Sequence, residues 1–545
     1  MFLPRLRLIG LIIIFTLTAS FAQAMSPSRK LGTVSFPTSG TGQAQKHFLR
    51  GVAALHSFWY TEALDAFQRS TEADPHFAMG YWGIAMAHNH PLWEEQDAES
   101  AQAALSKIPK NAELTQREQD YIHAVRLLYG DVKKPMRDKA YSKAMEKIYS
   151  TYPDDLEAAC FYSLSLLGLA RNAENKLPLQ VESGAIALEI FQRSPDHPCA
   201  AHYAIHALDT PDLARLALPS AKRFAKIAPA SAHAQHMPAH IFVQLGMWQE
   251  ASTSNKNGWT TSVDWVARKN LPKSERGYHS LQWLHYTTLQ QGLLQESAAV
   301  FAIQQKDMRE GIPSKSNLRA GKYYPRMLAA AILETEQWQK AGQLTPPEGW
   351  SPKSYARAET NFVRGFAAAM QGNKGAAKKH LAELKTIREK GFRKNFFKRP
   401  ENLQVWELEI QVAMKLQQRD YDAAIHLAKQ ATLIEEKLPA PSGPPRILKP
   451  TYELLGEVYL QAGKPIQAQE QFAISLGRHR NRLRSMVGAA RAARASGDKS
   501  TAKETYERLL SQLKNVDPGF PELAEAKEYF YKTQHKHMRL YSKAS

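Results

Sequence analysis

Cysteine is scarce in this chain: its 545 residues include only two, Cys160 and Cys199. Two cysteines do not make a disulfide framework, so the fold must depend on the packing of side chains. A single disulfide is permitted in an oxidising compartment. The sequence favours the alternative, in which both cysteines are small buried side chains.

Long apolar runs are lacking after the first 24 residues, so we expect no transmembrane segment in the mature chain. The N-terminus itself carries Arg5 and Arg7, a mostly apolar stretch over residues 8–21, and Ala-Gln-Ala at 22–24. This order is typical of a secretory signal peptide cleaved after Ala24. The sequence therefore predicts an exported protein, periplasmic or secreted.

Motifs of several common catalytic sites are also missing. The chain has no phosphate-binding glycine loop, no G-x-S-x-G elbow, no H-E-x-x-H pair and no cysteine in a nucleophile context. Acidic residues are outnumbered, with 52 against 71 basic ones and a net charge of +19, which favours an anionic surface or ligand as a partner. The densest basic run, residues 390–399, is interpreted as a solvated helix end, so no specific nucleic acid is predicted.

Strand patterns are scarce, and helical periodicity runs through most of the sequence. Residues 44–77 fit a tetratricopeptide (TPR) unit of two helices, with Gly51 and Ala63 where the helices cross and Phe67 filling the gap to the next unit. Thr115 and Glu118 predict a capping box at a helix start. We expect an all-α, tetratricopeptide-like helical repeat superhelix (α-solenoid) with roughly eight to ten helical pairs.

The predicted organisation has four parts. Residues 1–24 are the signal peptide, and 25–437 are a TPR-like array containing the histidine-rich units. Residues 438–450 (LPAPSGPPRILKP) include five prolines and are predicted to be a linker or a kink. Residues 451–545 hold further TPR units and a capping helix.

Two segments resemble a group of exported bacterial tetratricopeptide repeat proteins. They are GVAALHSFWYTEALDAFQRSTEADPHFAMGYWGIAMAHNHPLW (51–93) and HPCAAHYAIHALDTPDLARLALPSAKRFAKIAPASAHAQHMPAHIFVQLGMW (197–248). The resemblance covers most of the mature chain and is loose between residues 310 and 400. It implies a tetratricopeptide fold and adds no reaction.

Histidines are concentrated between residues 197 and 240 and form two pairs with i, i+4 spacing, which places both rings of a pair on one helix face. Neutral imidazole is a common ligand for Zn, Cu and Fe, and two such pairs on adjacent inner helices could converge on a divalent metal. The predicted metal ligands are His202, His206, Asp209, His236 and His240. Predicted ligand-binding residues nearby are Trp82, His88, His90, Trp248, His279 and His285.

Three other interpretations of the histidines remain open: a haem site, an anion site made of protonated imidazoles, and plain packing between helices. Two functions follow. The first is an exported TPR protein that binds a protein, a peptide or a small ligand in its concave groove. The alternative is a metal-dependent enzyme, either a hydrolase or an oxidoreductase, that uses the histidine-rich site.

Overall fold

The computed structural model describes residues 30–310, 321, 323–343, 355–392 and 400–541. Within these ranges the regular structure is helical, apart from one short ladder in which β1 (Asn89–His90) pairs antiparallel with β2 (Glu95–Gln96). The predicted all-α class is confirmed. The predicted signal peptide lies outside the described residues. Among those residues, no helix has both the length and the apolar character needed to cross a bilayer.

Consecutive helices pack on one another in pairs, and successive pairs stack along the chain. The N-terminal helices are α1 (Gly42–His56), α2 (Tyr60–Ala73), α3 (Ala78–Ala87), α4 (Ala98–Ser106), α5 (Gln116–Leu128), α6 (Lys134–Thr151), α7 (Leu156–Ala170) and α8 (Leu177–Arg193). The central helices are α9 (Pro198–Ala207), η2 (Ala214–Ala217), α10 (Leu218–Ile227), α11 (Ala232–His236), α12 (Pro238–Gln244), α13 (Trp248–Arg268), η3 (Lys273–Glu275), α14 (Tyr278–Gln290) and α15 (Leu294–Arg309).

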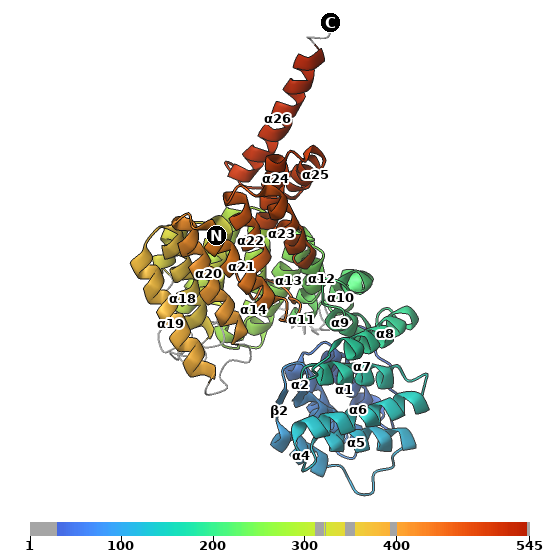
Figure 1. Cartoon of the computed structure of the whole chain (residues 1–545). Helices are drawn as coiled ribbons and strands as arrows, with labels where there is room; N and C mark the ends of the chain where they lie inside the picture. The colour runs from blue at the N-terminus through green and yellow to red at the C-terminus, as the bar shows by residue number, and fades with distance from the viewer. Residues whose placement is uncertain (1–29, 311–320, 322, 344–354, 393–399, 542–545) are drawn as a thin grey trace, which may run out of the picture.

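The C-terminal helices continue the same arrangement. They are α17 (Tyr324–Thr335), η4 (Trp338–Gln343), α18 (Tyr355–Met370), α19 (Lys374–Phe392), α20 (Glu401–Gln417), α21 (Tyr421–Glu435), α22 (Thr451–Gln461), α23 (Pro465–Arg478), α24 (Leu483–Ser496), α25 (Lys499–Gln512) and α26 (Pro521–Tyr541). Figure 1 shows the central helices α9–α14 between the N-terminal helices and the C-terminal ones, with α26 extending away from α24 and α25.

The repeat packing depends on glycines that face an aromatic ring. A Cβ on Gly51 of α1 would lie 2.5 Å from the ring of Phe67, and a Cβ on Gly83 of α3 would lie 2.2 Å from it. The fully buried Phe67 of α2 therefore fills the space between its own unit and the next one, as predicted. Phe472 of α23 lies in the same way against Gly456 and Gly488.

Two local predictions have different outcomes. The capping box is present: the Thr115 side chain accepts from the Glu118 N–H, and the Glu118 carboxylate accepts from the Thr115 N–H. The preferred interpretation of the cysteines is wrong, because Cys160 and Cys199 are joined by a disulfide although both are also fully buried. The reason is tertiary, since α7 and α9 pack side by side and bring the two Cα atoms to 6.0 Å.

Buried polar contacts connect the C-terminal helices to the central ones. The guanidinium of Arg482 donates to the hydroxyl of Tyr286 in the central helix α14 at 3.0 Å, and also to Glu453 of α22 and Glu334 of α17, each at 2.7 Å. Residues 438–450 form no helix and pass beside α14, where Gly443 contacts the indole of Trp283. The carbonyl of Pro441 also accepts a hydrogen bond from Gln244 of α12. The proline-rich segment therefore lies next to the histidine-rich helices.

Candidate metal centre

Three histidines converge on one point between α9 and α11, and we refer to His202, His206 and His233 as the first triad. The Nε2 atom of His202 lies 3.1 Å from the Nε2 of His206 and 3.1 Å from the Nε2 of His233. His202 is fully buried, whereas His206 and His233 are half-buried. The potential ligand atoms of the three side chains all lie within 4.8 Å of one another, so this group could hold a metal ion.

A second triad lies beside the first and consists of His236 of α11, His240 of α12 and His279 of α14. The ring of His236 is 5.1 Å from that of His240 and 4.7 Å from that of His279, measured between centroids. Here too the potential ligand atoms lie within 4.8 Å of one another. His236 is buried, His240 is half-buried and His279 is exposed. In each triad, one histidine is buried and the other two are less buried.

Oxygen acceptors fix the orientation of three of these rings. The Nδ1–H of His202 donates to the carbonyl of His56 at 2.6 Å, and that of His240 donates to Asp209 Oδ2 at 2.7 Å. His236 Nδ1 lies 2.6 Å from Asn255 Oδ1. The amide of Asn255 donates to the Ala251 carbonyl, which leaves its oxygen facing His236. A ring protonated at Nδ1 presents its Nε2 lone pair to the triad, and metal-ligating histidines are commonly held in this way.

Burial disfavours the protonated form of four of these imidazoles. It lowers the pKa of His202 to about 3, with neighbouring histidines contributing to the same direction. Burial, together with the charges of the other histidines, also lowers the pKa of His206, His233 and His236 well below the usual value. Metal ions bind the deprotonated nitrogen, so these side chains are in the form that coordinates a metal at neutral pH.

Aromatic side chains cover both triads. The ring of Phe58 lies 4.3 Å from that of His202 and also stacks near His206 and His233. Trp283 covers the second triad, with centroid distances of 4.5 Å to His240 and 4.9 Å to His236. These covers lower the local dielectric around the nitrogens and limit the space available beside them.

A third group is fully buried next to the first triad. Glu157 of α7 accepts from His56 Nε2 at 2.6 Å and from His197 Nε2 at 2.9 Å. Burial opposes ionisation of Glu157, but the two histidines outweigh it and lower the pKa of the carboxyl to about 2. Cys160 belongs to the same cluster, but its sulfur is held in the disulfide. We assign this group to a buried hydrogen-bond network around the Glu157 carboxylate.

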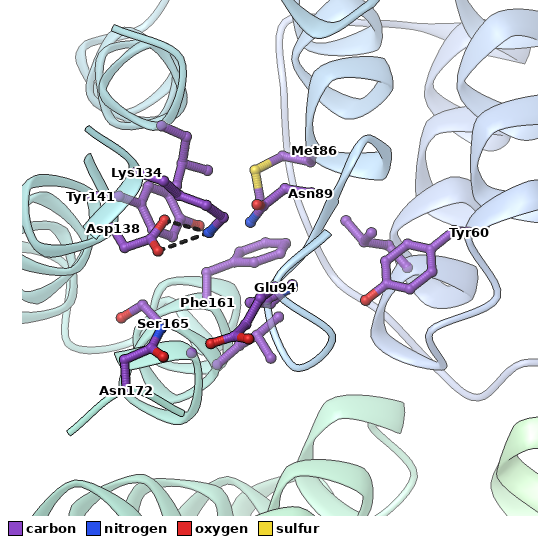
Figure 2. Close-up of a pocket in the computed structure, with 15 residues that line it drawn as sticks. Tyr60, Met86, Asn89, Glu94, Lys134, Asp138, Tyr141, Phe161, Ser165 and Asn172 are labelled. Atoms are coloured by element: carbon purple, nitrogen blue, oxygen red, sulfur yellow. Dashed lines mark hydrogen bonds and ion pairs between the residues drawn. The ribbon is translucent and has the colours of Figure 1, made fainter. Parts of the chain in front are cut away.

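A pocket of about 590 Å³ lies elsewhere, and residues of α2, α3, α6 and α7 contribute to its lining. Figure 2 shows Lys134 and Asp138 on one side of this pocket and Tyr60 on the opposite side. Tyr60 stacks on His90 at 3.8 Å and lies 5.8 Å from Phe58, which in turn contacts the first triad. The pocket is therefore separated from the histidines by this layer of rings.

The predicted metal ligands fall into two neighbouring groups. His202 and His206 belong to the first triad, and His236 and His240 belong to the second, which His279 joins. Asp209 lies behind His240 and orients it. Sequence reasoning missed His233, although it stands in the same histidine-rich stretch. Its spacing of three residues from His236 was the available sign.

The other predicted ligand-binding residues lie apart from both triads. Trp82 packs in the N-terminal core against Phe36 and Tyr121. Trp248 donates from its indole to the Asn481 carbonyl at 2.8 Å. His285 is buried beside Phe301, and burial lowers its pKa to about 3. His88 directly precedes the short ladder and His90 lies within β1, and their Nδ1 atoms lie 3.8 Å from Asp97 and 3.5 Å from Glu95, respectively.

The fold and the site together define an all-α, TPR-like helical-repeat protein with buried histidine groups that could hold metal ions. No protein-family model matches the chain. No curated protein matches it either.

Among solved structures, the chain is similar to three helical proteins at 12–13% identity. The APC/C hetero-tetramer Cut9–Hcn1 is 12% identical, with 91% of this chain and 78% of that chain covered and a TM-score of 0.29. The TPR domain of P58(IPK) is 13% identical, with 70% of this chain and 99% of that chain covered and a TM-score of 0.21. The human IFIT1 dimer with m7Gppp-AAAA is 13% identical, with 87% of this chain and 91% of that chain covered and a TM-score of 0.31.

Proposed function

We propose that this chain is a metal-dependent protein in which each histidine triad binds one transition-metal ion. The observation that carries the proposal is the convergence of three Nε2 atoms at 3.1 Å contacts in the first triad. His202 donates from Nδ1 to a backbone carbonyl, so its neutral ring has only one in-plane lone pair to offer to two neighbouring nitrogens. A cation at the centre of the triad satisfies all three lone pairs at once.

The composition of each triad supports a catalytic role over a purely structural one. Three protein ligands with an open fourth position are typical of catalytic zinc-type sites, whereas structural sites have four protein ligands. Two histidines of each triad are less buried than the third, and the proposal places the open position of the ion on their side. The function we infer is a metal-dependent enzyme, either an oxidoreductase or a hydrolase, that uses Zn, Cu or Fe.

We also infer export from the N-terminal sequence, since residues 1–24 have the order of a signal peptide. The disulfide between Cys160 and Cys199 supports an oxidising compartment, because such bonds are rare in the reducing cytosol.

The test is elemental analysis of protein purified without a histidine tag. We expect two transition-metal ions per chain, one of which is lost in His202→Gln and the other in His236→Gln. His285→Gln is the matched control, since this buried histidine of α14 lies outside both triads and should leave the metal content unchanged. Metal-free protein whose thermal unfolding is insensitive to added Zn²⁺ and Cu²⁺ would show that the histidines only pack.

A further inference from the structure

The two triads lie next to each other and share the helix α11. The helix α11 contributes His233 to the first triad and His236 to the second, and the two rings lie 6.5 Å apart. The rings of His206 and His240 approach within 6.1 Å. Within the first triad, His206 and His233 are themselves 6.0 Å apart, so the separation between triads is hardly larger than the separation inside one.

The ligand set is made of imidazoles alone. Neither triad includes a carboxylate or a thiolate among the described residues, and Asp209 bonds to the far nitrogen of His240. Oxygen-rich sets suit Mg²⁺, Ca²⁺ and Mn²⁺, and two histidines with one carboxylate are typical of non-haem iron. Three neutral imidazoles per ion suit Cu and Zn, and Cu²⁺ has the higher affinity for nitrogen sites.

We propose that the two triads form a single binuclear copper centre, in which both ions share one small external ligand on the solvent side. This inference rests on the proposed function, because it requires that each triad binds an ion. Two-metal sites that share a ligand place their ions about 3.5–4 Å apart. The ring centroids of His206 and His240 lie 6.1 Å apart and those of His233 and His236 lie 6.5 Å apart, so the two triads are adjacent.

The aromatic side chains of Phe58 and Trp283 limit the size of the external ligand. Phe58 packs against all three rings of the first triad, and Trp283 packs against all three rings of the second. In each triad, two of the three histidines are less buried than the third, and the shared ligand is placed on their side. Because aromatic rings crowd both triads, the class is a small molecule or anion of two or three atoms that can bridge two copper ions, and inorganic azide is a suitable probe.

The test compares copper content with electron paramagnetic resonance (EPR). Full-length mature protein is stripped with a chelator, loaded with Cu²⁺ and desalted, and its copper is counted by elemental analysis. Two Cu²⁺ ions that share a bridging ligand couple their spins and lose their EPR signal. We expect two copper ions per chain with an integrated EPR signal near zero, and a new absorption band when azide is added.

Variants that lack one ligand of a single triad should show less copper and more EPR signal than the unchanged protein. His206→Gln and His240→Gln should each bind one copper ion and give one full spin, so the EPR signal rises while the copper content halves. His285→Gln should behave as the unchanged protein. Circular dichroism shows whether each variant is folded. If a variant does not fold, the copper content and EPR signal of the unchanged protein still decide between a binuclear centre and two separate sites.

The outcomes separate the inference from the function on which it rests. Two copper ions with two full spins would show two independent sites, which overturns the binuclear centre and leaves the metal function in place. One copper ion with one spin would also overturn the binuclear centre. Protein that retains no copper after desalting would overturn the proposed function itself.

Discussion

Replacement of Asp209 by asparagine tests whether the second triad is built to hold a metal. The Oδ2 atom of Asp209 accepts from His240 Nδ1 at 2.7 Å, and its Oδ1 accepts from Gln244 Nε2 at 2.9 Å. Asparagine has one oxygen and one NH₂ group, so whichever way it turns, one of the two neighbours meets a donor. If the oxygen stays with Gln244, the ring of His240 loses the acceptor that fixes its tautomer.

The expected loss follows from the role of such outer contacts. Mutation of a group that orients a metal-ligating histidine commonly lowers metal affinity by about 10- to 100-fold, or about 1.4–2.8 kcal/mol. The loss should be confined to one ion. In the first triad, His202 is oriented by the backbone carbonyl of His56, which the substitution does not touch.

The assay is a competition titration of metal-free protein with Cu²⁺ and a chelator of known affinity. Asp209→Asn should show one site with unchanged affinity and one weakened site. The matched control is Asp212→Asn, which alters an exposed carboxylate three residues away and should leave both affinities unchanged. Equal affinities at both sites in Asp209→Asn, or an equal weakening of both, would refute the assignment of Asp209 to the second triad.

Three further predictions follow from single contacts. In Gly443→Ala, the new Cβ would lie 2.1 Å from the indole of Trp283, so this side chain must move. We expect a shifted tryptophan fluorescence and weaker copper binding at the second triad alone. Unchanged fluorescence would contradict this prediction. In Arg482→Met, the buried carboxylate of Glu334 loses its cation, and Glu453 keeps only Lys449, which should cost about 3–5 kcal/mol in urea unfolding. A change below about 1 kcal/mol would show the Arg482 ion pairs to be dispensable. The pKa of Glu157 is lowered to about 2 from 4.5, so the stability that its ionised form contributes is present above pH 4.5 and is lost as the pH falls toward 2. Glu157→Gln should therefore be less stable than the unchanged protein at pH 7, and its stability should fall less between pH 4.5 and pH 2.

The repeat fold could be predicted from the sequence because the residues that determine how two helices pack lie within one unit or in the next one. A small residue opposite an aromatic ring, as Gly51 opposite Phe67, recurs with the period of the helix pairs and needs no knowledge of distant contacts. The capping box at Thr115 is local in the same sense. The disulfide was not predictable in this way. Its formation depends on the side-by-side packing of α7 and α9, which composition does not reveal.

The histidine pairs were also visible in the sequence, but their grouping was not. The spacing of four residues shows that two rings share a helix face, while the neighbouring helix that this face meets is a tertiary fact. His279 joins the second triad from α14. His285, six residues later, is rotated by about 240° around the same helix and lies against Phe301 instead. The sequence alone did not show which of these two histidines would join the triad, so both were predicted to bind a ligand.

The backbone at Phe58 gives a physical reason to regard the first triad as more than a packing cluster. This residue has φ of 50°, a left-handed conformation that is uncommon for a bulky side chain and that costs on the order of 1 kcal/mol. The strained turn between α1 and α2 places its ring against His202, His206 and His233 together. Glycine would relieve the strain but would remove a ring that packs against all three histidines. The chain therefore retains a costly residue at a position from which its ring helps to hold the three histidines in place, as a preorganised set of ligands requires.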